Sequence, residues 1–156
     1  MLFVATAEAG DEEMHQRIEK HKEGRPATWD TLEATTSIGN QISQKMGGAR
    51  VVVVDCMALL INNLFGQYND QTDASLIEKK VADEIDELIE CIKHADATFI
   101  IVTNEIGLGL VPTNRMGRLY RDLLGKVNQR LAEVAEEVYL MVAGLPVQIK
   151  PPQHIG

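Results

Sequence analysis

The sequence gathers basic residues around one histidine, His21, although the chain as a whole is acidic. Lys20 and Lys22 flank this histidine within RIEKHKEGRPATW (17–29), and Arg25 follows four residues later. Neighbouring positive charges favour the neutral imidazole, which is the form that can attack phosphorus, and they also attract a polyphosphate. The pattern therefore indicates a histidine that acts as a nucleophile toward phosphorus.

Asp55 is a second residue whose position suits phosphate chemistry. It ends the apolar run VVVVD (51–55) as a Walker B carboxylate does, where it could hold Mg²⁺ beside nucleotide phosphates. Ligands of open α/β sheets bind outside the carboxyl ends of the strands, and this aspartate is expected at such an end.

Both residues also have a purely structural interpretation, and the sequence leaves the alternatives open. On a helix, His21 shares a face with Met14 and Ile18, as a core histidine or a histidine that caps the helix C-terminus would. Asp55 equally fits an ordinary acidic residue in a strand-to-helix turn.

Three arginines form a further candidate surface. Arg115, Arg118 and Arg121 recur at intervals of three, so on a helix they make one basic stripe beside the apolar one. The stripe is either a solvated face paired with local carboxylates or a surface that meets an anion or another subunit.

The sequence contains no Walker A phosphate-binding loop, which needs Gly, four residues, Gly, Lys and then Ser or Thr. MGGAR (46–50) runs directly into an apolar strand, and Gly125-Lys126 is followed by Val127 inside a predicted helix. The motif GLG (107–109) is too short for a dinucleotide-binding fingerprint.

Composition restricts the class of protein. The chain has 156 residues, about one domain, and a net charge of −8, which argues against general affinity for nucleic acid or an anionic membrane. It shows neither a signal peptide nor an apolar run long enough to span a membrane, so we expect a cytoplasmic protein. Cys56 and Cys91 lack the spacing of a metal site and are expected as reduced core residues.

Strands and helices alternate along the chain. Residues 23–31 are expected as an open stretch, and the strands at 50–56 and 98–104 as buried on both faces. The alternation predicts an α/β three-layer fold with a mainly parallel sheet and a C-terminal antiparallel pair, forming one domain over residues 1–150 with a tail at 151–156. The predicted strands are 2–6, 50–56, 98–104, 138–144 and 146–150, with a turn around Gly144, and the predicted helices are 11–21, 37–46, 57–65, 73–94 and 114–136.

Four segments resemble the bifunctional adenosylcobinamide kinase and adenosylcobinamide-phosphate guanylyltransferase family. They are DEEM (11–14), RIEKHKEGRPATW (17–29), VVVVDCMALLINNL (51–64) and the long block 102–150. The resemblance implies a RecA-like P-loop fold and a homotrimer. It also implies that ATP or GTP phosphorylates adenosylcobinamide, and that GMP passes from GTP through a histidine phosphoramidate to adenosylcobinamide phosphate.

The resemblance assigns roles by position. His21 matches the guanylylated histidine, and Asp55 matches the Walker B acid that holds Mg²⁺. The residues that match nucleotide-contacting positions are Thr6, Ala7, Glu8, Lys22, Glu23, Gly24, Arg25, Glu33 and Asp55.

One departure from the family opens a second interpretation. Family members begin with a strand, a GGARSGKS-type loop and a helix, whereas Met1 stands here where their second strand begins. We therefore expect a sheet with an exposed apolar edge. The alternative to a bifunctional enzyme is a fragment or non-catalytic relative that binds nucleotide weakly or joins other subunits.

Overall fold

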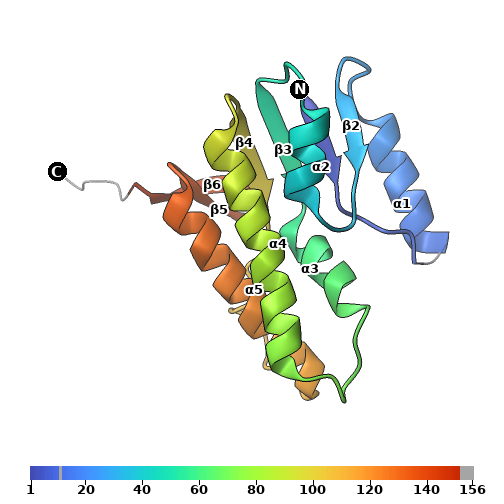
Figure 1. Cartoon of the computed structure of the whole chain (residues 1–156), viewed down its shortest axis with the longest axis vertical. Coiled ribbons are helices and arrows are strands. Elements are labelled where there is room, and N and C mark those ends of the chain that lie inside the picture. Colours follow the sequence, from blue (N-terminus) through green and yellow to red (C-terminus); the bar gives the residue numbers. More distant parts are fainter. Residues whose placement is uncertain (11, 152–156) are drawn as a thin grey trace.

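Figure 1 shows the computed structural model of the chain, which describes residues 1–10 and 12–151. The strands are β1 (Leu2–Ala5), β2 (Asp30–Glu33), β3 (Val51–Asp55), β4 (Thr98–Val102), β5 (Val138–Val142) and β6 (Leu145–Lys150). The helices are α1 (Glu12–Glu23), α2 (Ile38–Lys45), α3 (Met57–Phe65), α4 (Ala74–His94) and α5 (Arg115–Val134). Every predicted element is present, with ends displaced by a few residues.

Four parallel strands form the main sheet in the order β2-β1-β3-β4. β1 pairs with both β2 and β3, so that Ala5 lies beside Glu33 on one side and Asp55 on the other. On the far side of β3, Asp55 pairs with Val102. The carboxyl ends of these strands therefore lie at one edge of the sheet, which we call the carboxyl edge.

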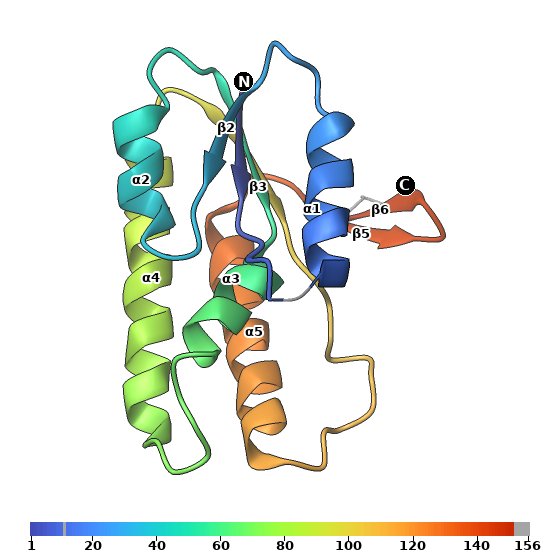
Figure 2. The ribbon, with the colours of Figure 1, turned by 90° about the vertical axis from the view of Figure 1, so that its right-hand side faces the viewer.

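The two faces of the sheet are covered unequally. α2 and α4 lie on one face and α1 on the other (Figure 2). The core draws on α2, α3, α4 and α5, whereas α1 buries none of its side chains. The three-layer α/β prediction is confirmed, and the layer made by α1 is the weakly attached one.

Side-chain caps fix where the two long helices begin. The Asp73 carboxylate accepts a hydrogen bond from the Ser75 amide at 3.0 Å ahead of α4, and this bond lowers the pKa of Asp73. The Asn114 side chain accepts from the Gly117 amide at 2.6 Å ahead of α5. Among the described helices, none is long and apolar enough to cross a membrane.

The prediction that residues 23–31 form an open stretch is wrong at its end, because Asp30 begins β2. The sequence DTLE (30–33) carries one buried apolar residue, Leu32, and no strand-like pattern. The segment becomes a strand because its backbone pairs with that of β1, so the tertiary contact outweighs a weak local preference for strand.

The prediction that β4 is buried on both faces is also wrong. Ile100 is 49% exposed and Val102 is 41% exposed, while Phe99 and Ile101 pack toward the core. β4 is the last strand of the sheet, and in the part of the chain that the structure describes no strand pairs with its outer edge. The expected open apolar edge is therefore present at β4.

β5 and β6 form a separate antiparallel pair, as predicted. Ala143 (φ 51°) and Gly144 (φ 80°) make the turn, which suits the twist of a tight hairpin and confirms the predicted position. Cys56 and Cys91 are buried and free, as predicted, and burial raises the pKa of the Cys56 thiol. The predicted tail, beyond Pro151, lies outside the described residues.

Candidate functional site

The carboxyl edge brings Thr6 and Asp55 together. The Thr6 hydroxyl is fully buried, donates to the Cys56 carbonyl at 2.7 Å and accepts from the Cys56 amide at 2.8 Å. The Thr6 amide donates to the Asp55 carbonyl at 3.1 Å. These bonds continue the pairing of β1 and β3 past the strand ends and hold the backbone beside Asp55. Ala7 is half-buried and Glu8 exposed on the loop that follows.

Asn63 extends this arrangement to a third strand. Its side-chain amide donates to the Thr6 carbonyl at 2.7 Å and to the Thr35 carbonyl, just after β2, at 3.3 Å. The ends of β1 and β2 are thereby tied to α3. Sequence reasoning missed this residue, and the available signal was a polar side chain inside the apolar helix MALLINNLF (57–65).

Asp55 could supply one carboxylate to a magnesium ion. Asp55 is half-buried at the carboxyl edge. Among residues 1–10 and 12–151, no group of three or more His, Cys, Asp or Glu side chains could enclose a metal. Mg²⁺ typically takes one or two protein carboxylates and completes its shell with phosphates and water. One carboxylate at this position agrees with that donor set.

A second group of predicted residues joins the end of α1 to β2. The Lys22 ammonium lies 2.7 Å from a Glu33 carboxylate oxygen and 3.0 Å from a Glu19 oxygen. The hydrogen bond to Glu33, followed by the one to Glu19, raises the pKa of Lys22. The ion pair fixes the C-terminal turn of α1 against the sheet while leaving the lysine partly accessible.

Arg25 lies between this ion pair and two aromatic rings. The guanidinium carbon sits 4.1 Å from the centroid of the Phe3 ring, and Phe3 stacks on Trp29 with centroids 6.3 Å apart. Arg25 Nε and Nη1 are buried and find no hydrogen-bond acceptor among the described residues. Two buried donors without an acceptor are costly unless a ligand supplies one.

A hollow of about 300 Å³ opens over this group, lined in part by Lys22, Arg25, Trp29 and Glu33. Two cationic side chains and an indole suit an anionic ligand with an aromatic ring. Sequence reasoning identified the charged residues and assigned no role to Phe3 or Trp29, because their approach depends on the pairing of β1 with β2.

His21 is exposed, so the interpretation as a core histidine is wrong. It lies nine residues after the start of α1, about 14 Å along the helix axis. α1 begins near the carboxyl edge and runs back along the strands (Figure 2). The structure thus brings Lys22, Arg25 and Glu33 together near His21, and Thr6 beside Asp55. The two groups meet at the carboxyl edge, where Ala5 pairs with Glu33 on one side and with Asp55 on the other.

Two of the three arginines in the stripe make hydrogen bonds to nearby backbone carbonyls. Arg115 donates to the carbonyls of Asp70 and Thr72 at 2.8 and 3.2 Å. Arg118 donates to the carbonyls of Pro112 and Thr113 at 3.2 and 2.7 Å. These bonds fasten the loops before α4 and α5, which favours the locally paired alternative over an anion-binding face.

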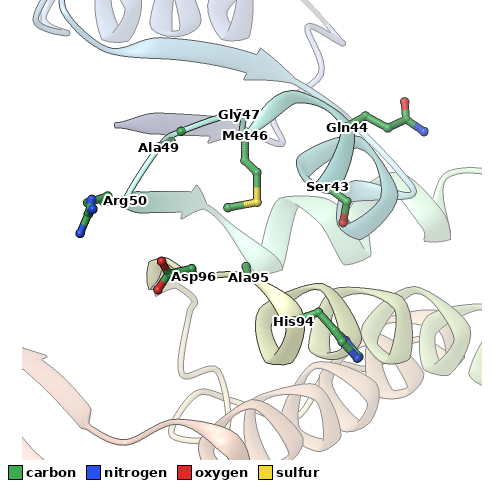
Figure 3. Close-up of a pocket in the computed structure, with 10 residues that line it drawn as sticks. Ser43, Gln44, Met46, Gly47, Ala49, Arg50, His94, Ala95 and Asp96 are labelled. Carbon is green, nitrogen blue, oxygen red and sulfur yellow. The ribbon is translucent and has the colours of Figure 1, made fainter.

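A different hollow, of about 490 Å³, lies at the opposite end of β3 between residues 43–50 and 94–96. Figure 3 shows Met46 pointing into it, while Arg50 and His94 point outward on opposite sides. None of the predicted site residues lines it, and its polar groups do not converge.

The parallel sheet with helices on both faces makes this an α/β protein, and the P-loop type of fold follows from the family to which the chain belongs. The chain belongs to the cobinamide kinase / cobinamide phosphate guanyltransferase family, whose sequence model matches residues 1–149.

Three curated relatives carry related names. The bifunctional adenosylcobalamin biosynthesis protein CobU of Salmonella typhimurium is 40% identical over 155 residues, covering 96% of this chain and 86% of the relative. CobU of Escherichia coli is 37% identical with the same coverage. CobP of Pseudomonas aeruginosa is 36% identical over 148 residues, covering 95% of this chain and 81% of the relative.

Proposed function

We propose that this protein acts in cobalamin biosynthesis, phosphorylating adenosylcobinamide with ATP or GTP and then transferring GMP to adenosylcobinamide phosphate. Family membership supports the pathway, since the three relatives are named as bifunctional adenosylcobalamin biosynthesis proteins. The proposal rests on one observation at the site: Nε and Nη1 of Arg25 are buried and have no hydrogen-bond acceptor among the described residues. Arg25 lies on the segment that follows His21. Phosphate oxygens would satisfy both donors.

In the guanylyl step, a neutral His21 nitrogen attacks the α-phosphorus of GTP. A P–N bond forms, the bond from that phosphorus to the bridging oxygen breaks, and pyrophosphate leaves. A phosphate oxygen of adenosylcobinamide phosphate then attacks the same phosphorus, the P–N bond breaks, and His21 returns to its neutral form. In the kinase step, the substrate hydroxyl oxygen attacks the γ-phosphorus and loses its proton, the bond from that phosphorus to the β–γ bridging oxygen breaks, and the nucleoside diphosphate leaves.

The remaining predicted residues take binding roles in this proposal. Lys22 and Arg25 neutralise the phosphates, Glu33 orients Lys22 through their 2.7 Å ion pair, and the Glu23-Gly24 backbone follows the nucleotide. The loop of Thr6, Ala7 and Glu8 lies beside Asp55 at the carboxyl edge. Asp55 would hold Mg²⁺, which when bound offsets the negative charge of the transferred phosphoryl group.

In this proposal one triphosphate reaches from His21, in the last turn of α1, to Asp55 at the end of β3. Met14, Ile18 and Lys22 are half-buried and no side chain of α1 is fully buried, so a small adjustment of α1 costs less than moving a helix of the core. The end of α1 and the segment after it are attached to the sheet through the Lys22–Glu33 ion pair and the contact of Arg25 with Phe3.

The test is self-labelling with GTP carrying a labelled α-phosphate, in the presence of Mg²⁺. The chain should acquire acid-labile label that disappears in His21→Ala and persists in His15→Ala, since His15 is an exposed histidine on the same helix. An unlabelled wild-type chain, or label that survives in His21→Ala, would contradict the proposal.

A non-catalytic role is the second candidate, supported by the unpaired apolar edge at β4 and the exposed side chains of β5 and β6. Such surfaces favour association with other subunits. GTP binding without label on His21, together with a sedimentation mass above that of one chain, would favour this role. The homotrimer implied by the family is tested by the same mass measurement.

A further inference from the structure

The loop between β4 and α5 displays apolar side chains to solvent. Leu108 is 85% exposed, Leu110 is 97% exposed and Val111 is 61% exposed, within four consecutive residues. Single exposed leucines are common on protein surfaces, whereas a continuous group of them marks a binding surface. We call these three residues the apolar loop tip.

The apolar loop tip lies on a loop that leaves the sheet next to Asp55. β4 ends at Val102, which pairs with Asp55, so the loop leaves the sheet at the carboxyl edge. Figure 2 shows this segment projecting beyond the carboxyl ends of the strands, clear of the helices. A ligand that lies on the tip and extends back along the loop would approach Asp55.

Hydrogen bonds hold the loop in shape. The Glu105 carboxylate accepts from the Gly107 amide at 2.7 Å, and the Ile106 carbonyl accepts from the Gly109 amide at 3.2 Å. At the start of the loop, the Asn128 side chain donates to the Asn104 carbonyl at 3.1 Å. The tip is thus a supported surface, which reduces the ordering cost that a ligand would have to overcome.

The charges around the tip disfavour an anionic occupant, because Glu105 is an exposed carboxylate on the same loop. The nearest cations, Arg115 and Arg118, each donate to two backbone carbonyls and are not directed at the tip. The exposed side chains of Asn104 and Thr113, near the two ends of the loop, are uncharged hydrogen-bonding groups. The surface therefore suits a ligand that has an apolar face and hydrogen-bonding groups on its rim and that carries no negative charge where it meets the tip.

We propose that the apolar loop tip is the surface on which the corrin ring of the cobinamide substrate lies. This inference rests on the proposed function. A corrin presents methyl and methylene groups on its faces and amides on its rim, which matches leucine and valine flanked by asparagine and threonine. Three side chains alone are too small for a subunit contact, which buries about 800 Å² per partner.

The test measures binding of dicyanocobinamide by equilibrium dialysis, and the visible absorbance of the corrinoid gives its concentration on each side of the membrane. The double variant Leu108→Ser/Leu110→Ser should bind it roughly tenfold more weakly or worse, because its apolar contact area is lost. The matched control Leu76→Ser removes a 46% exposed leucine on α4 and should bind like the wild type. All of these side chains are exposed, so thermal unfolding should confirm that both variants are folded.

Unchanged affinity in the double variant would overturn the proposal, as would a fall in its sedimentation mass, which would assign the tip to a subunit contact. Labelling the wild type with GTP in parallel separates this proposal from the function on which it rests. A wild-type chain that labels at His21 but fails to bind dicyanocobinamide overturns the docking surface alone. One that binds dicyanocobinamide at the tip without labelling contradicts the guanylyl step alone.

Discussion

Replacing Asn63 with alanine should loosen the carboxyl edge without touching the core. The variant loses the 2.7 Å hydrogen bond to the Thr6 carbonyl and the 3.3 Å bond to the Thr35 carbonyl. Thr6 is fully buried, so its carbonyl is left without a partner, at a cost of about 1–3 kcal/mol. The higher helix propensity of alanine offsets about 0.5 kcal/mol of this loss of stability. We expect a net loss of about 2 kcal/mol in the free energy of unfolding.

Asn62→Ala is the matched control, because Asn62 precedes Asn63 on α3 and is exposed. It makes the same change in helix propensity, so it should leave stability unchanged or slightly raised. Urea unfolding followed by circular dichroism measures both variants, and thermal unfolding should place the midpoint of Asn63→Ala about 4–8 °C below the wild type. A difference between the two variants of less than about 0.5 kcal/mol would refute the argument that Asn63 ties the strand ends together.

Two further predictions concern stability elsewhere in the chain. Gly39→Ala should destabilise the chain by about 3 kcal/mol in urea unfolding, because a Cβ there would lie 2.5 Å from the Glu87 carbonyl oxygen. Gly48→Ala, whose Cβ meets nothing within 4 Å, is its control, and equal losses would contradict the packing argument. Asp73, whose pKa lies below its ordinary value of 3.8 because of the Ser75 amide, should stabilise α4 above about pH 4. That contribution is lost as the pH falls through the lowered pKa, so the wild type should lose stability toward acid more steeply than Asp73→Asn, and parallel pH profiles would count against the cap.

Much of the fold could be predicted because its elements carry their own patterns. α4 places Ile77, Val81 and Ile85 on one buried stripe, and β3 is a run of β-branched residues. β2 could not be predicted, because DTLE (30–33) becomes a strand through its pairing with β1. The exposure of β4 depends on its place in the sheet order, which local sequence does not encode.

The candidate site was predictable where its residues are contiguous. Lys22 and Arg25 follow His21 directly, and the structure places the lysine beside Glu33. The contributions of Asn63 and Phe3 depend on contacts between distant segments, so no local pattern reveals them. That Glu33 and Asp55 end strands on either side of β1 follows from the sheet order β2-β1-β3, which is a property of the whole fold.

The transfer of GMP through His21 is the central claim, and a chase experiment tests it most directly. The chain is labelled with α-labelled GTP, freed of nucleotide and then mixed with adenosylcobinamide phosphate. We predict that label leaves the His21-containing peptide and appears in adenosylcobinamide-GDP in equal amount. Label that remains on the protein, or that is released as free GMP without reaching the corrinoid, would contradict the account.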